Sequence, residues 1–308
     1  MTSSAIAVSG LRKAYGDKVV LDGIDLDVRA GSVFSLLGPN GAGKTTTVNV
    51  LTTLMKADGG TARVGGFDLA AQARSVRSVI GVTGQFAAVD DLLTGQENLQ
   101  LMVDLKGASD RLVPELLERF DLVESAGKPA ATYSGGMRRK LDLAMTLVGN
   151  PRIVFLDEPT TGLDPRSRRT MWTIVRELVA DGATIFLTTQ YLEEADQLAD
   201  RIAVLDQGRL VAQGTPDELK RMVPGTHVRL RFTTGAELDA AARLFSGATR
   251  DDEALSLRIP SDGGTTSLRA LLDELDEHSV SAEGFSVHTP DLDDVFLALT
   301  GHTTEAAK

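Results

Sequence analysis

One stretch of this sequence has the residue types and the spacing of a loop that binds phosphate groups. It consists of Gly38, Pro39, Asn40, Gly41, Ala42, Gly43, Lys44 and Thr45, and Thr46 follows directly. The pattern is G-x-x-x-x-G-K-[ST], which is found between a strand and a helix. Gly41 and Gly43 let main-chain N–H groups approach a polyphosphate, and Lys44 supplies positive charge for the outer phosphates. The Thr45 hydroxyl is a hard oxygen ligand, so the sequence predicts a nucleotide site with Mg²⁺.

Two acidic side chains follow the apolar run Ile153-Val154-Phe155-Leu156. They are Asp157 and Glu158, at the end of a predicted buried strand. Next to a phosphate loop, Asp157 is expected to hold the Mg²⁺ shell, in part through water, and Glu158 to polarise a water for attack on the γ-phosphate. The alternative is a strand end that simply reaches solvent.

Two further polar side chains stand at positions where they could contact a ligand. Tyr15 lies in a turn after the first predicted strand, where its ring could stack on a nucleobase. On position alone, a tyrosine that covers the edge of the β region is at least as plausible. Gln85 follows the short strand 80–83, and strand ends gather ligand contacts in open α/β sheets. A single glutamine at such a position is more often a surface residue.

A serine and two glycines open a second predicted helix. Ser134, Gly135 and Gly136 offer a capping hydroxyl, free N–H groups and the positive helix end, which together can bind an anion. A plain N-cap is the alternative. The following segment 138–140 (Arg-Arg-Lys) is expected to be a solvated face.

The elements that must position these residues alternate along the chain. Short strands are predicted at 6–8, 19–21 and 24–28, a hairpin at 59–66, and a helical insertion at about 90–150. Buried strands at 153–157 and 183–189 alternate with helices at 166–180 and 191–200. This alternation predicts an α/β fold whose sheet is mainly parallel and covered on both faces, preceded by an antiparallel β region.

The pattern changes near residue 226. Three alternating strands and three helical stretches predict a small C-terminal α/β domain over 226–308, so the nucleotide-binding domain would be 1–225. The tail has 7 Lys and Arg against 15 Asp and Glu, so it carries −8 of the chain's net charge of −11. It contains no phosphate loop, which favours a role in interaction or regulation.

Composition limits the classes of protein that fit. The net negative charge argues against a nucleic-acid binder that relies on a broad basic surface. The chain has no cysteine, which is compatible with a reducing cytosol. We expect no signal peptide and no membrane-spanning helix, so any membrane role is expected to be peripheral or through a partner.

Taken in order, these motifs resemble those of the ATP-binding subunits of ABC transporters over about residues 4–222. The resemblance implies that Tyr15 stacks on adenine, that Gln85 senses Mg²⁺ and the attacking water, and that Glu158 is the catalytic base. It also implies that residues 133–137 form the signature that binds the γ-phosphate held by a second copy. Asp164 would then lie in a loop at that dimer interface.

The sequence departs from the family pattern at two places. The signature usually reads Leu-Ser-Gly-Gly-Gln, whereas here Tyr133 and Met137 flank an intact Ser-Gly-Gly core. The family's switch histidine is replaced by Gln190, and all four histidines lie in the tail. A glutamine amide can donate a hydrogen bond to the γ-phosphate, but it carries no positive charge.

The segment 188–196 and the end of the tail, 290–301, are similar to the daunorubicin/doxorubicin-resistance type of exporter ATPase. This resemblance implies an ATPase at the cytoplasmic face of the membrane that pairs with a second copy and with an ABC-2 type permease. The cargo would be a drug or another hydrophobic compound. Two alternatives stay open: a soluble ABC ATPase without a membrane partner, and a regulator with weak ATPase activity.

Overall fold

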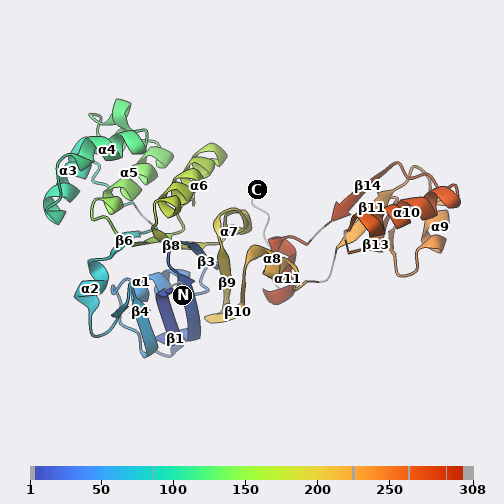
Figure 1. The fold of residues 1–308 in the computed structure, drawn as a ribbon, viewed down its shortest axis with the longest axis horizontal. Helices are drawn as coiled ribbons and strands as arrows, with labels where there is room; N and C mark the ends of the chain where they lie inside the picture. Colours follow the sequence, from blue (N-terminus) through green and yellow to red (C-terminus); the bar gives the residue numbers. More distant parts are fainter. Residues whose placement is uncertain (1–3, 86, 224–225, 263, 289, 301–308) are drawn as a thin grey trace. The chain divides into compact units, whose positions relative to one another are not determined.

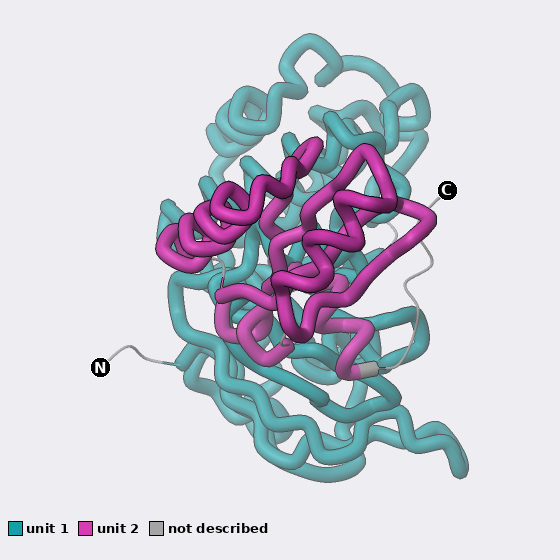
Figure 2. Tube along the Cα trace, turned by 90° about the vertical axis from the view of Figure 1, so that its right-hand side faces the viewer, with its two compact units in different colours: residues 1–216 teal, residues 217–308 magenta. Residues whose placement is uncertain are grey.

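The computed structural model describes residues 4–85, 87–223, 226–262, 264–288 and 290–300. The chain divides into two compact units, Met1–Pro216 and Asp217–Lys308 (Figure 2). The domain boundary expected from the sequence, at 225/226, falls inside the second unit.

The first unit is built on a six-stranded sheet in the order β10-β9-β3-β8-β7-β6 (Figure 1). Its parallel strands are β3 (Val33–Leu37), β6 (Ile80–Thr83), β7 (Ile153–Asp157), β8 (Thr184–Thr189) and β9 (Arg201–Asp206), and β10 (Arg209–Gly214) runs antiparallel to β9. Every residue of β3, β7 and β8 is buried, as expected for strands covered on both faces. The ring of Phe186 packs against those of Phe34 and Phe155 within a hydrophobic core of this unit.

An antiparallel sheet precedes the phosphate loop and continues after its helix. Its order is β2-β1-β4-β5, made of β1 (Ser4–Tyr15), β2 (Lys18–Arg29), β4 (Gly59–Val64) and β5 (Phe67–Asp68). The two short strands predicted at 19–21 and 24–28 are one strand, β2. Gly23, which has a φ of 78°, lies where the register with β1 shifts, so a bulge rather than a break separates the two halves.

The helices of the first unit cover the six-stranded sheet and form a helical part between β6 and β7 (Figure 1). They are α1 (Lys44–Leu51), α2 (Ala73–Arg77), α3 (Gly95–Lys106), α4 (Leu112–Arg119), α5 (Gly135–Leu147), α6 (Pro165–Ala180) and α7 (Leu192–Leu198). Two short turns of 3₁₀ helix, Val123–Ser125 and Ala130–Thr132, precede α5. Thr94 and Glu97 form a capping box that fixes the start of α3.

The second unit has an antiparallel sheet of its own, in the order β12-β13-β11-β14. Its elements are α8 (Pro216–Lys220), β11 (His227–Arg231), α9 (Gly235–Leu244), β12 (Thr249–Asp251), β13 (Ser256–Pro260), α10 (Thr265–Glu277), β14 (Gly284–His288) and α11 (Leu292–Thr300). Val228, Leu230 and Leu257 pack against Leu238 and Leu271 in a small core. No helix in the described ranges is both long enough and apolar enough to cross a bilayer.

Candidate active site

The phosphate loop connects β3 to α1, and its glycines are required by the backbone. Gly41 and Gly43 have φ values of 81° and 112°, which a residue with a Cβ adopts only at a cost. A Cβ on Gly38 would lie 2.3 Å from the main-chain oxygen of Leu205 in β9. The loop therefore folds back tightly over the sheet edge, while Thr45 stays exposed at the start of α1.

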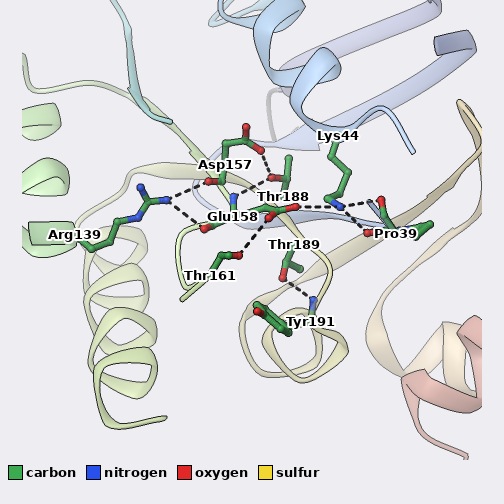
Figure 3. Close-up of polar contacts among 10 residues, drawn as sticks. Pro39, Lys44, Arg139, Asp157, Glu158, Thr161, Thr188, Thr189 and Tyr191 are labelled. Atoms are coloured by element: carbon green, nitrogen blue, oxygen red, sulfur yellow. Dashed lines mark hydrogen bonds and ion pairs between the residues drawn. The ribbon is translucent and has the colours of Figure 1, made fainter. Parts of the chain in front are cut away.

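Lys44 is the buried cation of the site, with 4% of its side chain exposed. Its Nζ donates to the main-chain oxygens of Gly38 at 2.7 Å and Pro39 at 3.0 Å, and lies 3.2 Å from Glu158 Oε1 (Figure 3). Burial lowers the pKa of Lys44, and the nearby Glu158 carboxylate opposes that shift. A charged Lys44 thus depends on its oxygen partners, and phosphate oxygens could replace them.

Asp157 and Glu158 lie at the carboxyl end of β7, both with less than a tenth of their surface exposed. The Thr188 hydroxyl donates to Asp157 Oδ1 at 2.5 Å and accepts from the Glu158 main-chain N–H at 3.1 Å. Thr161 Oγ1 donates to Glu158 Oε2 at 3.2 Å. Glu158 has a φ of 50°, so these bonds hold a strained backbone position. Thr188, which sequence reasoning did not single out, joins the two acidic residues.

The oxygen atoms at this edge suit a hard cation. Within the described ranges only Oδ1 of the Asp157 carboxylate has a hydrogen-bond donor, so Oδ2 is available as a ligand. Carboxylate and hydroxyl oxygens, as offered by Asp157 and Thr45, are what Mg²⁺ prefers. The chemistry of these residues fits the predicted ion.

Gln85 and Gln190 follow β6 and β8, at the same edge of the sheet as Asp157 and Glu158. Gln85 is exposed and Gln190 is half-buried. Neither amide has a hydrogen-bond partner in the part of the chain that the structure describes. Both side chains are thus free to meet a ligand at this edge.

Ser134 and Asp164 cap two neighbouring helices. Ser134 Oγ accepts from Met137 N at 3.2 Å at the start of α5, and Asp164 accepts from Ser167 N at 3.0 Å at the start of α6. The Ser167 hydroxyl bonds to the Asp164 carboxylate, and these bonds lower the pKa of Asp164. A Cβ on Gly136 would lie 2.6 Å from Ser167 Oγ, so the two helix starts are in contact. Among the described residues, no hydrogen bond joins 134–136 to the phosphate loop.

Tyr15 ends β1 with 48% of its surface exposed. Its hydroxyl donates to Met55 Sδ at 3.0 Å, and Lys13 Nζ lies 5.8 Å from the ring centroid. The exposed ring is accessible for stacking, but the contact with Met55 is also what a tyrosine covering the β region would make.

The prediction of a solvated face at 138–140 is wrong for Arg139. Arg138 and Lys140 do reach acidic surface residues, Asp91 and Asp121. The side chain of Arg139 is buried instead and bonds to main-chain oxygens at and just beyond the ends of β6 and β7. An arginine with an aspartate three residues later, Asp142, was the one local signal of a buried charge pair.

Residues 21–161 match the family profile described as ABC transporter, and residues 214–300 match the C-terminal domain described as ATP-binding protein DrrA1-3-like. The chain is 49% identical to a daunorubicin resistance ATP-binding protein of Streptomyces coeruleorubidus, over 99% of this chain and 98% of that protein.

Two more distant similarities agree with that result. A Nod factor export ATP-binding protein I of Ralstonia nicotianae is 38% identical, over 96% of this chain and 94% of that protein. A solved ATP-binding subunit of an ABC transporter is similar with a TM-score of 0.64 and 30% identity, over 71% of this chain and 93% of that one. The likeness in fold confirms the predicted α/β core with its mixed sheet.

Proposed function

This chain belongs to the ABC transporter ATP-binding proteins of the daunorubicin/doxorubicin resistance type and is an ATPase, and we propose that it powers export through a separate membrane subunit. The observation that carries the catalytic part is the contact between Lys44 of the phosphate loop and Glu158 at the end of β7, 3.2 Å apart. That contact joins Lys44, the proposed phosphate-binding cation, to Glu158, the proposed base.

In this proposal residues 38–46 hold the triphosphate of ATP, and Tyr15 stacks on the base. Lys44 exchanges its present oxygen partners, Glu158 Oε1 among them, for phosphate oxygens, which frees the Glu158 carboxylate. Glu158 then accepts a proton from the attacking water, with its carboxylate still oriented by the Thr161 hydroxyl. Mg²⁺ held by Thr45 and Asp157 would neutralise charge that develops on the phosphate oxygens.

Gln85 and Gln190 complete the edge around the γ-phosphate. We assign Gln85 to the Mg²⁺ shell and the attacking water, and Gln190 to a γ-phosphate oxygen. The Gln190 amide donates a neutral hydrogen bond where a protonated histidine would supply a charge-assisted one, which is about twice as strong. Turnover is therefore expected to be modest and to lack a histidine titration.

A second copy of the chain is expected to complete each site. One chain carries one phosphate loop and one Ser134-Gly135-Gly136 signature, and the signature residues form no hydrogen bond to their own loop in the described ranges. Ser134 and Gly135 are exposed at the positive end of α5, where they can bind the γ-phosphate of a partner chain. Asp164, at the adjacent start of α6, would lie at the same interface.

The role in export rests on the relatives. Their names describe ATP-binding proteins of daunorubicin resistance and of Nod factor export, and this chain matches them along nearly its whole length. We propose a drug or another hydrophobic compound as cargo, an integral ABC-2 type permease as partner, and a location at the cytoplasmic face of the membrane. The second unit is proposed to serve interaction or regulation.

Glu158→Gln tests the catalytic core. The variant is expected to bind ATP with unchanged affinity and to hydrolyse it at least about 100-fold more slowly, since the amide cannot accept the proton. Phosphate release and ATP affinity are measured with and without Mg²⁺, and removal of Mg²⁺ with EDTA is expected to stop hydrolysis in the natural protein.

Glu177→Gln on α6 is the matched control because Glu177 is exposed and far along the helix from the site. Near-normal phosphate release by Glu158→Gln would remove Glu158 as the base. Export is tested separately with inverted vesicles that contain the co-expressed membrane subunit, where Lys44→Ala should abolish ATP-driven uptake of the cargo.

A further inference from the structure

The ladder between β6 and β7 stops just before the residues that we assign to catalysis. Its last pair is Thr83 with Leu156. Beyond it the two segments continue as Gly84-Gln85 and Asp157-Glu158-Pro159, which are no longer paired with each other. Polar main-chain groups that are buried at such a point need another donor.

The guanidinium of Arg139 supplies that donor for both segments. It donates to the oxygens of Gly84 at 2.6 Å, Pro159 at 3.0 Å, Asp157 at 3.1 Å and Glu158 at 3.3 Å. The side chain extends from α5 toward Asp157 and Glu158 (Figure 3). Only 7% of the residue is exposed, so these bonds form away from water. The planar fork of an arginine can reach several acceptors at once, whereas a lysine ammonium cannot match that geometry.

Asp142, one turn further along α5, connects Arg139 to the segment that follows β6. Its Oδ2 lies 3.5 Å from Arg139 Nη1, and its Oδ1 accepts from the main-chain N–H of Ala88 at 2.9 Å. Asp142 is also buried, and its charge compensates that of Arg139. The pair therefore fixes the chain on both sides of Gln85, at Gly84 and at Ala88.

We propose that Arg139 is a positioning residue for ATP hydrolysis, which sets the main chain that carries Gln85 and Glu158 and joins it to the signature helix α5. The inference rests on the roles proposed above for these two side chains. Glu158 has a left-handed backbone, and Arg139 bonds to its main-chain oxygen and to those of both neighbours. Loss of the guanidinium would let the Glu158 carboxylate move relative to the attacking water.

The order of the strands predicts that loss of the Arg139 guanidinium leaves ATP binding intact. The phosphate loop follows β3, and β8 separates β3 from β7 in the sheet. No hydrogen bond in the described ranges joins Arg139 to residues 38–46. A defect confined to the ends of β6 and β7 should therefore lower the turnover number and leave the affinity for ATP unchanged.

The experiment compares kcat and the ATP dissociation constant in Arg139→Gln and Arg139→Lys. We expect kcat to fall by about 10- to 100-fold in Arg139→Gln, since misplacing a reacting group by about 1 Å has effects of that size. The kcat of Arg139→Lys should lie between those of Arg139→Gln and the natural protein. Both variants should bind ATP with the affinity of the natural protein. Lys140→Gln is the matched control, because Lys140 bonds to Asp121 on the surface and should keep full activity.

A double variant separates positioning from general stability. In a Glu158→Gln background the base is already lost, so adding Arg139→Gln should cost little further activity. Natural turnover in both Arg139 variants would overturn the proposal, and so would a parallel loss of kcat and ATP affinity. If Arg139→Gln is insoluble, Arg139→Lys decides by the same criteria. Failure of the proposed function is distinguishable, because it would appear as full activity in Glu158→Gln alone.

Discussion

Glu194 is a buried carboxyl group of the site region that has no assigned role in catalysis. It lies in α7, four residues after Gln190, and none of its surface is exposed. The indole Nε1 of Trp172 in α6 donates to its Oε1 at 3.1 Å, and the hydroxyls of Thr160 and Thr189 beside the carboxyl favour its ionised form. Burial outweighs these bonds and the charge of Arg168, so the pKa of Glu194 is raised above the usual value for glutamate. It therefore joins α6 to the segment that carries Gln190, at a cost when it is ionised.

The pH dependence of stability tests this assignment. Because the folded protein holds the Glu194 proton more tightly than the unfolded chain, ionising Glu194 destabilises the fold as pH rises above the ordinary value of 4.5. Glu194→Gln keeps an acceptor for Trp172 and removes the ionisation. Its free energy of unfolding, relative to the natural protein, should therefore increase from about pH 5 to about pH 8 in urea titrations.

Glu193→Gln is the control for that series, because its side chain is 66% exposed and has little burial to relieve. If the difference in unfolding free energy between Glu194→Gln and the natural protein stayed constant across the pH range, a raised pKa of Glu194 would be contradicted.

At the level of single residues, the sequence was most informative where a side chain follows an apolar strand. Carboxyl ends of parallel strands meet at one edge, which is why Lys44, Asp157 and Glu158 were expected near one another and lie so in the structure. Arg139 was missed for a physical reason. Its burial depends on main-chain oxygens at the ends of β6 and β7, which lie far from α5 in the sequence, and Asp142 is the one sign of it within α5.

At the level of elements, the start of α5 depends on a tyrosine where the family usually has leucine. Tyr133 is buried in the core, and its hydroxyl donates to the Ser125 main-chain oxygen at 2.7 Å. Its Oη would lie only 2.1 Å from a Cβ on Gly95, so a glycine at the first position of α3 leaves room for the longer side chain. Tyr133 thus links the starts of α3 and α5.

Removing the hydroxyl of Tyr133 should weaken this link. Tyr133→Phe is expected to cost about 1 kcal/mol of unfolding free energy, the net value of a buried hydrogen bond, because Ser125 loses its donor. Urea unfolding measures the effect, and a Tyr133→Phe protein as stable as the natural one would show that the bond contributes nothing.

Elements with strong local patterns were predicted well, and weak ones were not. The runs that form β3, β7 and β8 are apolar throughout, so their burial in a parallel sheet could be read from the sequence. The sequence predicts a gap between two strands where the bulge at Gly23 lies, because a glycine interrupts the alternation that defines a strand. The three-residue strand β12 was missed because so short a stretch has no period of its own.

At the level of the whole molecule, the proposed reaction needs more than one chain. The phosphate loop, the two acidic residues and both glutamines meet at one edge of the first unit, whereas the signature is exposed at the start of α5. We propose that the two halves of the site come from different copies of the chain. That inference comes from the resemblance to the family and from the lack of hydrogen bonds between 134–136 and the chain's own loop within the described ranges.

Two inactive variants can test whether the site is shared. Lys44→Ala removes the phosphate-binding charge. Gly135→Asp puts a carboxylate beside the γ-phosphate of the partner, and it should fold because a Cβ there meets only Leu163 Cδ2 at 3.8 Å. A mixed dimer of these two variants keeps one intact site, formed by the loop of one chain and the signature of the other. Gly127→Asp, in open space on the same helical part, is the matched control and should remain active.

The most direct measurement is ATP hydrolysis by each variant alone and by a 1:1 mixture. The account predicts that each variant alone is nearly inactive and that the mixture recovers roughly a quarter of natural activity, since half the dimers are mixed and each has one working site. Full activity of Gly135→Asp alone, or a mixture no more active than its components, would contradict a site shared between two chains.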